Sequence, residues 1–178
     1  MAFIDADEFF EFRDGSKSIN DFLKDYEYAG AVHTDYEIYG ADKQERKTEV
    51  PVQKRFKKVF KKENGFGKII VQPARVGNMR IHFAHFYKGS YTVNDNHKRA
   101  GDAGFFNRTG QKERLVLKHY ITKSYEEWCN KIKRGTCDPS YSRKYRDFFK
   151  YNRDMEHLRD EDMIAEVQKY TGQEQFVI

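Results

Sequence analysis

The chain has 178 residues, a length that suits one domain with a hydrophobic core, or a domain with a helical extension. Aromatic residues make up 16% of the chain, with 15 Phe and 12 Tyr, which argues against a disordered chain poor in large side chains. The formal net charge of +5 favours an anionic partner such as a nucleotide, a phosphate, a membrane surface or a nucleic acid, without choosing among them.

The cysteines and the hydropathy pattern predict a compartment. Cys129 and Cys137 lie outside any C-x-x-C pattern, so we expect two reduced thiols. No apolar run approaches the roughly 20 residues of a membrane span, and the acidic start of the chain lacks the basic region of a signal peptide. We therefore expect a cytoplasmic protein, with or without peripheral attachment to a membrane.

Strand and helix signals alternate in the first part of the chain. Residues 1–4 are apolar and are followed by Asp5, which predicts a short strand. Residues 18–28 predict a helix, with Ser18 as its N-cap. Residues 31–40 predict a second strand, and the polar residues 41–56 predict a surface loop.

Three further strands are expected in the middle of the chain. Residues 68–73 form a short apolar run closed by Pro73. Residues 79–87 alternate in character, which predicts a single strand with His85 on the same face as two apolar residues. Residues 114–122 predict another strand, with His119 among apolar neighbours.

Helices are expected toward the carboxyl end. Ser124 and Glu127 have the spacing of a capping box, and Gly135 fits the stop position of the same helix. Residues 138–158 predict a loop and a helix, and residues 160–172 predict a further helix. This order of elements predicts an α/β or α+β fold.

The N-terminal acidic residues carry the strongest chemical signal. Asp5 and Asp7 are two residues apart after the first predicted strand, so their carboxylates would converge beside the sheet. Carboxylates that lie this close together repel one another unless they are neutralised or protonated. Mn²⁺ or Mg²⁺ would relieve that repulsion, because both ions prefer oxygen ligands. A chance D-x-D in an acidic turn is the alternative.

More than one class of metal-using enzyme carries an acidic pair after a strand. A phosphatase of the haloacid dehalogenase type requires a different residue where this chain has Phe9. A nucleotidyltransferase carries a Gly-Ser element before its acidic pair, and too few residues precede Asp5 to test for it. A basic nucleic-acid-binding module without catalysis is the alternative function, resting on the run KRFKKVFKK at residues 54–62. The acidic cluster would repel such a partner, so no nucleic acid is expected.

Several segments together resemble one family group. FIDADEFFEF resembles the F-I-D-x-D-E-F segment of the glycosyltransferases of families 2 and 92 with the GT-A fold. INDFL, DYEIYG, KRF, KIIVQP and LKHYITKSYEEWCNKIKRG resemble segments that follow in the same order. These matches span residues 3–135, which is most of the chain.

The resemblance implies metal-dependent transfer of a sugar from a nucleotide-diphosphate sugar to a hydroxyl of a glycan or another acceptor. By position, Asp7 would be the main metal ligand, Asp5 would contact the ribose or the metal through water, and His119 would complete the metal site. Glu8 would support these ligands or face the acceptor. The candidates for a catalytic base are Asp35, Glu37 and Asp42, and we expect Asp42 because it follows Gly40 in a predicted loop. Lys123, His85 and Tyr36 are the candidate substrate-binding residues.

The resemblance also implies how the chain is organised. We expect the carboxyl-side part of a GT-A mixed sheet with flanking helices in residues 1–123, on the metal and acceptor side. Residues 124–178 would then form a helical extension. The chain begins at the acidic motif, so we expect a truncated form with little activity alone, and a homo-oligomer or a partner chain that completes the sheet.

Overall fold

The computed structural model describes residues 1–60, 66–100, 112–137 and 140–159. The chain divides into two compact units. The first contains Met1–Glu37 and Lys61–His119, and the second contains Ile38–Phe60 and Tyr120–Ile178. Within the described residues, no helix is both long and apolar enough to span a membrane. The functional division predicted after residue 123 stays a prediction.

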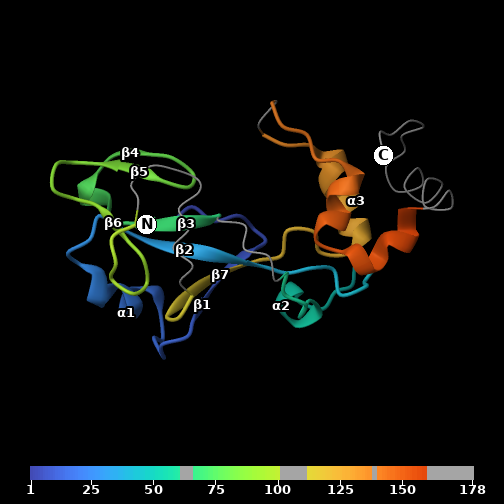
Figure 1. Ribbon diagram of the computed structural model, residues 1–178, viewed down its shortest axis with the longest axis horizontal. Coiled ribbons are helices and arrows are strands. Elements are labelled where there is room, and N and C mark those ends of the chain that lie inside the picture. Colours follow the sequence, from blue (N-terminus) through green and yellow to red (C-terminus); the bar gives the residue numbers. More distant parts are fainter. Residues whose placement is uncertain (61–65, 101–111, 138–139, 160–178) are drawn as a thin grey trace. The chain divides into compact units, whose positions relative to one another are not determined.

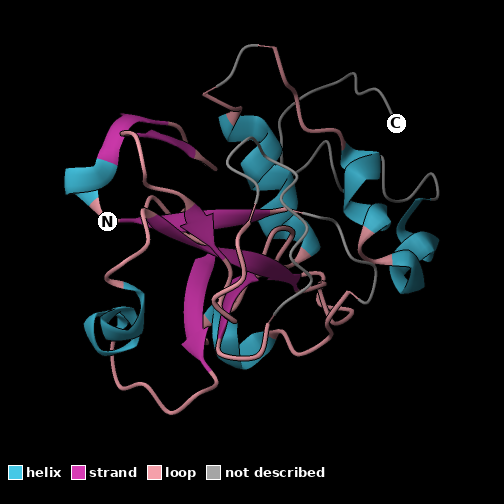
Figure 2. Cartoon of the chain, turned by 60° about the vertical axis from the view of Figure 1, so that its left-hand side comes forward, coloured by secondary structure: helices cyan, strands magenta, loops and turns pink. Residues whose placement is uncertain are grey.

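The first unit is built on a mixed sheet. Its strands lie in the order β1 (Glu8–Phe12), β7 (Leu115–His119), β2 (Ala31–Ile38) and β3 (Gly67–Val71), as Figure 1 shows. Strand β1 is antiparallel to β7 and β2 is antiparallel to β3, whereas the short β6 (Thr92–Val93) runs parallel to β2. This mixed sheet with helices confirms the predicted α/β class (Figure 2).

Alternation along the strands gives this sheet two different apolar faces. On one face, Val32 and Ile70 pack with Leu115 and with Phe22 of helix α1 (Ile19–Leu23). On the other face, the residues adjacent in sequence to Val32 and Ile70 pack against the hairpin of β4 (Val76–Met79) and β5 (Ala84–Phe86). The cluster on that second face consists of Ala31, Ile69, Val71 and Ala84.

Two strand predictions were wrong in their extent. Residues 1–4 form only an isolated bridge, from Ala2 to Ile70, and the regular strand β1 begins at Glu8. Asp5 and Asp7 therefore precede β1, and Glu8 is its first residue, instead of all three following a strand. Residues 79–87 do not form one strand, because the hydrogen bond from the Arg80 N–H to the Phe83 carbonyl closes a turn between β4 and β5.

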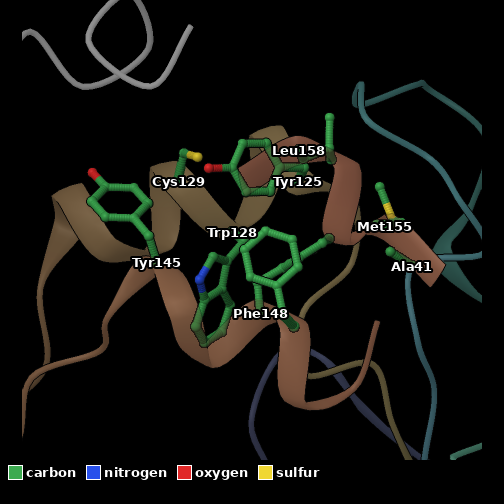
Figure 3. Close-up of a cluster of buried hydrophobic side chains, with 9 residues drawn as sticks. Ala41, Tyr125, Trp128, Cys129, Tyr145, Phe148, Met155 and Leu158 are labelled. Carbon is green, nitrogen blue, oxygen red and sulfur yellow. The ribbon is translucent and has the colours of Figure 1, made fainter. Parts of the chain in front are cut away.

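The second unit has an aromatic core beneath helix α3 (Tyr125–Arg134). Tyr125 and Trp128 of α3 pack with Phe148 from the 3-10 helix η3 (Tyr145–Lys150), as Figure 3 shows. The remaining helical segments are η1 (Lys24–Tyr26), α2 (Val52–Arg55), η2 (Pro73–Arg75) and η4 (Arg153–Arg159). The helix predicted at residues 160–172 lies outside the described residues.

Local capping explains where α3 begins and ends. Ser124 accepts a hydrogen bond from the Glu127 backbone while the Glu127 carboxylate accepts one from the Ser124 backbone, and this confirms the capping box. Gly135 ends the helix with a φ of 79°, as predicted. Burial raises the pKa of Glu127, but hydrogen bonds from Arg55 and Ser124 outweigh that effect and leave the pKa below its usual value.

Replacing Ser124 by Ala is expected to lower the free energy of unfolding by about 1 kcal/mol, because the first turn of α3 loses its side-chain acceptor. Urea denaturation followed by circular dichroism measures the change. Ser142→Ala is the matched control, because Ser142 is exposed and outside the helix. Equal stability of the two variants would show that the cap contributes nothing.

Candidate functional site

A buried lysine lies at the centre of the acidic cluster. The Lys68 side chain is 2% exposed, and its Nζ lies 2.7 Å from Glu8 Oε2 and 3.0 Å from Asp5 Oδ2. A lysine is almost never this deeply buried without a partner of opposite charge. Lys68 therefore supplies positive charge that offsets the repulsion between the N-terminal carboxylates.

Glu8 links that lysine to the backbone of the acidic turn. Its carboxylate is fully buried and accepts hydrogen bonds from the Tyr36 hydroxyl at 2.7 Å and from the Asp5 N–H at 2.9 Å. The Glu8 N–H donates to the Asp5 carbonyl at 3.0 Å, which closes the turn from the other side. Residues 5–8 are thus fixed by two reciprocal hydrogen bonds and one buried ion pair.

Tyr36 serves this arrangement as a permanent hydrogen-bond donor. Burial, followed by the nearby charge of Glu8, raises the pKa of the Tyr36 phenol far above its usual value. The hydroxyl therefore keeps its proton at physiological pH and donates it to Glu8. The Tyr36 ring also packs against the His119 ring, with 4.8 Å between the ring centres.

Asp7 and His119 form a second pair beside this arrangement. His119 Nε2 lies 3.7 Å from Asp7 Oδ1, and the two side chains are 13% and 10% exposed. His119 Nδ1 lies 3.9 Å from Glu8 Oε1. The predicted metal ligands Asp7 and His119 are therefore brought together from opposite ends of the first unit's sequence.

Strand pairing explains why the side chains of Glu8, His119, Tyr36 and Lys68 lie close together. Glu8 lies directly opposite His119 in the β1–β7 ladder, and Lys68 lies opposite Thr34 in the β2–β3 ladder. Tyr36 is two residues beyond Thr34, so it projects from the same face of β2. Glu8, His119, Tyr36 and Lys68 all occupy the face of the sheet that carries Val32, Ile70 and Leu115.

Comparison with known proteins supports a family assignment for this sheet and its acidic turn. A sequence model of glycosyltransferase family 92 matches residues 1–166. The chain belongs to glycosyltransferase family 92. No curated protein and no solved structure matches the chain. Family membership confirms the predicted resemblance, and the GT-A form of the fold stays a prediction.

Glycosyltransferase activity follows from the family in general terms. An enzyme of this kind takes a sugar from a nucleotide-sugar donor and delivers it to a glycan acceptor. The remaining predicted residues of this family 92 protein differ in how well their positions suit such a role.

Asp42 and Lys123 belong to the second unit. The Asp42 carboxylate accepts hydrogen bonds from the backbone N–H groups of Lys57 and Lys58, so it holds a loop in place. Asp42 and Lys123 have φ values of 49° and 55°, in the left-handed region. Lys123 lies directly before the N-cap of α3. Neither arrangement identifies a catalytic base or a phosphate ligand, and both roles stay predictions.

His85 lies apart from the cluster of buried side chains. It is exposed on β5, with its ring edge-on to Phe83 and 5.5 Å between the ring centres. Tyr36, by contrast, is only 7% exposed and contacts Glu8 and His119. Its position favours a role in holding the site over direct contact with a substrate.

Sequence reasoning missed Lys68. The signal for it was a lone lysine inside the apolar strand GKIIV, because such a residue requires a buried partner. Sequence alone could not show that the buried partner is Glu8, or that Asp5, 63 positions away, also contacts this lysine.

The donor atoms suit a divalent cation in part. Asp7 offers carboxylate oxygen and His119 offers imidazole nitrogen, a pair that suits Mn²⁺. Glu8 is a poor ligand, because Lys68 and Tyr36 occupy its two oxygens. No group of three or more His, Cys, Asp or Glu side chains is arranged to hold a metal within the described residues. Asp7 and His119 are thus the two side chains here that could hold a metal, and the metal site stays a prediction.

Proposed function

We propose that this family 92 protein is a metal-dependent glycosyltransferase that moves a sugar from a nucleotide-diphosphate sugar to a hydroxyl group of a glycan. Asp7 and His119 would hold Mn²⁺ or Mg²⁺. The observation that carries the proposal is the 3.7 Å approach of His119 to Asp7 at the end of a turn that Lys68 and Glu8 fix in place. The metal, when bound, would offset negative charge that develops on the diphosphate leaving group.

The protein's own side chains would orient this site. Lys68 and Tyr36 hold the Glu8 carboxylate, and Glu8 holds the Asp5 backbone, so Asp7 has little freedom to move. Tyr36 also limits the orientation of the His119 ring. Glu8 is fully buried, which favours its predicted role of supporting the metal ligands over that of facing the acceptor. The identity of the catalytic base stays a prediction.

Metal removal tests the proposed function. Transfer or hydrolysis of a panel of uridine- and guanosine-diphosphate sugars is measured after treatment with a chelator, and again after Mn²⁺ is added. We expect activity to fall by roughly 100-fold or more without metal, since the charge on the leaving group is then unscreened. Full activity in excess chelator, unchanged when Mn²⁺ is added, would contradict metal dependence.

A further inference from the structure

A second surface feature lies on the first unit, at the turn between β4 and β5. It is a depression of about 570 Å³ whose lining contains aromatic, aliphatic and basic side chains. This volume is in the range of small-ligand sites. The lining residues are Phe3, Met79, Arg80, Ile81, His82 and Phe83.

The depression exposes apolar surface to solvent. Phe3 and Ile81 are 51% and 62% exposed, although the β4–β5 hairpin has a buried face on which Ala84 packs. Arg80 is also exposed and adds a fork of hydrogen-bond donors beside these apolar groups. A pyranose matches this combination, because one face of the ring is lined by C–H groups and its edge carries hydroxyls that accept hydrogen bonds.

Hydrogen bonds connect the depression with the acidic turn. His82 Nδ1 lies 3.0 Å from the Gly67 carbonyl, which can only accept, so this nitrogen carries the proton. The next residue of β3 is Lys68, which contacts Asp5 and Glu8. Phe3 also precedes Asp5 by only two residues. The depression therefore lies beside the start of β3, one residue from the lysine that contacts the acidic turn, although its hairpin packs on the sheet face opposite to Glu8 and His119.

We infer that the depression formed by Phe3 and residues 79–83 is the acceptor subsite, where a pyranose unit of the glycan stacks on Phe3 and Ile81 and hydrogen-bonds to Arg80. The inference rests on the proposed function, because a sugar transferase must hold its acceptor beside its donor. His82 is a positioning residue here: its hydrogen bond to Gly67 fixes the turn that carries Ile81 and Arg80.

Two binding measurements on the full chain test the inference separately from the proposed function. Binding of fluorescently labelled protein to a printed array of glycans reports on the depression. Calorimetric titration with UDP in the presence of Mn²⁺ reports on the donor site. The variants are Phe3→Ala and Arg80→Ala, and the control is Tyr87→Ala, because Tyr87 is also 62% exposed and follows the same hairpin but does not line the depression.

We expect Phe3→Ala and Arg80→Ala to weaken glycan binding by roughly 10-fold each, while UDP affinity stays unchanged. Tyr87→Ala should bind glycans as the wild type does. Wild-type binding to no glycan on the array, or equal glycan binding by all three variants, would overturn the inference. If the wild type binds glycans at the depression but does not bind UDP in the presence of Mn²⁺, the result would instead contradict the proposed function.

Discussion

Replacing Lys68 by Met is expected to lower the free energy of unfolding by about 3–5 kcal/mol, because the substitution leaves the Glu8 carboxylate buried without its cation. Met keeps much of the volume and the apolar stem of the lysine, so the cost comes mainly from the lost charge. The Tyr36 hydroxyl and the Asp5 N–H remain as donors to Glu8, but neither carries a full positive charge.

Urea denaturation of the variant and the wild type measures this cost. Lys24→Met is the matched control, since Lys24 is 71% exposed and pairs with Asp21 on the surface. Surface pairs of that kind contribute about 0–1 kcal/mol. The double variant Lys68→Met with Glu8→Leu should recover part of the lost stability, because no buried charge then lacks a partner, although the Tyr36 hydroxyl loses its acceptor. If Lys68→Met costs no more than Lys24→Met, Lys68 does not stabilise the acidic turn.

Replacing Asp7 by Asn is expected to reduce kcat/KM for sugar transfer by at least about 100-fold, which corresponds to roughly 2.7 kcal/mol of transition-state stabilisation. Asn has almost the same shape as Asp but no charge, so the proposed metal loses its anionic protein ligand. The free energy of unfolding should change by less than about 1 kcal/mol, because the substitution keeps the buried ion pair of Lys68 with Glu8 that holds the acidic turn.

The Asp7 experiment requires a control for the general loss of a carboxylate. Asp25→Asn serves this purpose, since Asp25 is 56% exposed and pairs with Arg114 elsewhere on the first unit. Apparent Mn²⁺ affinity, taken from the dependence of the rate on added metal, should weaken for Asp7→Asn and not for Asp25→Asn. Unchanged transfer by Asp7→Asn at limiting Mn²⁺ would show that Asp7 is not a metal ligand.

The features that the sequence predicts correctly depend on local signals. Ser124, Glu127 and Gly135 define the ends of α3 through contacts a few residues apart, and the structure confirms each of them. The segments that became β2, β3 and β7 were also predicted as strands, because apolar residues recur in each short segment.

The features that the sequence misplaced depend on distant partners. Residues 1–4 have an apolar strand pattern, but their pairing with β3 is limited to the bridge between Ala2 and Ile70 and the hydrogen bonds between Met1 and Val71, so they form a bridge and not a strand. Residues 79–87 alternate correctly, but pairing of Met79 with Ala84 folds them into a hairpin. Alternation indicates which faces side chains occupy, and it does not reveal where the chain turns back.

The candidate site shows the same limit. Asp5, Asp7 and His119 were predicted as candidates from residue type and family resemblance. The ion pair between Lys68 and Glu8 was not predicted, because it forms only when β3 and the turn before β1 are brought together. Tyr36 was predicted to bind the substrate, whereas its hydroxyl donates a hydrogen bond to the Glu8 carboxylate, 28 positions away in the chain.

A crystal soaked with Mn²⁺ and UDP tests the central claim most directly, because anomalous scattering locates manganese independently of activity. The claim is that Lys68 neutralises Glu8 while Asp7 and His119 bind the metal. We predict an anomalous peak in contact with Asp7 and His119, with Lys68 still paired with Glu8. A peak on Glu8 with Lys68 displaced, or well-ordered UDP with no manganese beside Asp7, would contradict the account.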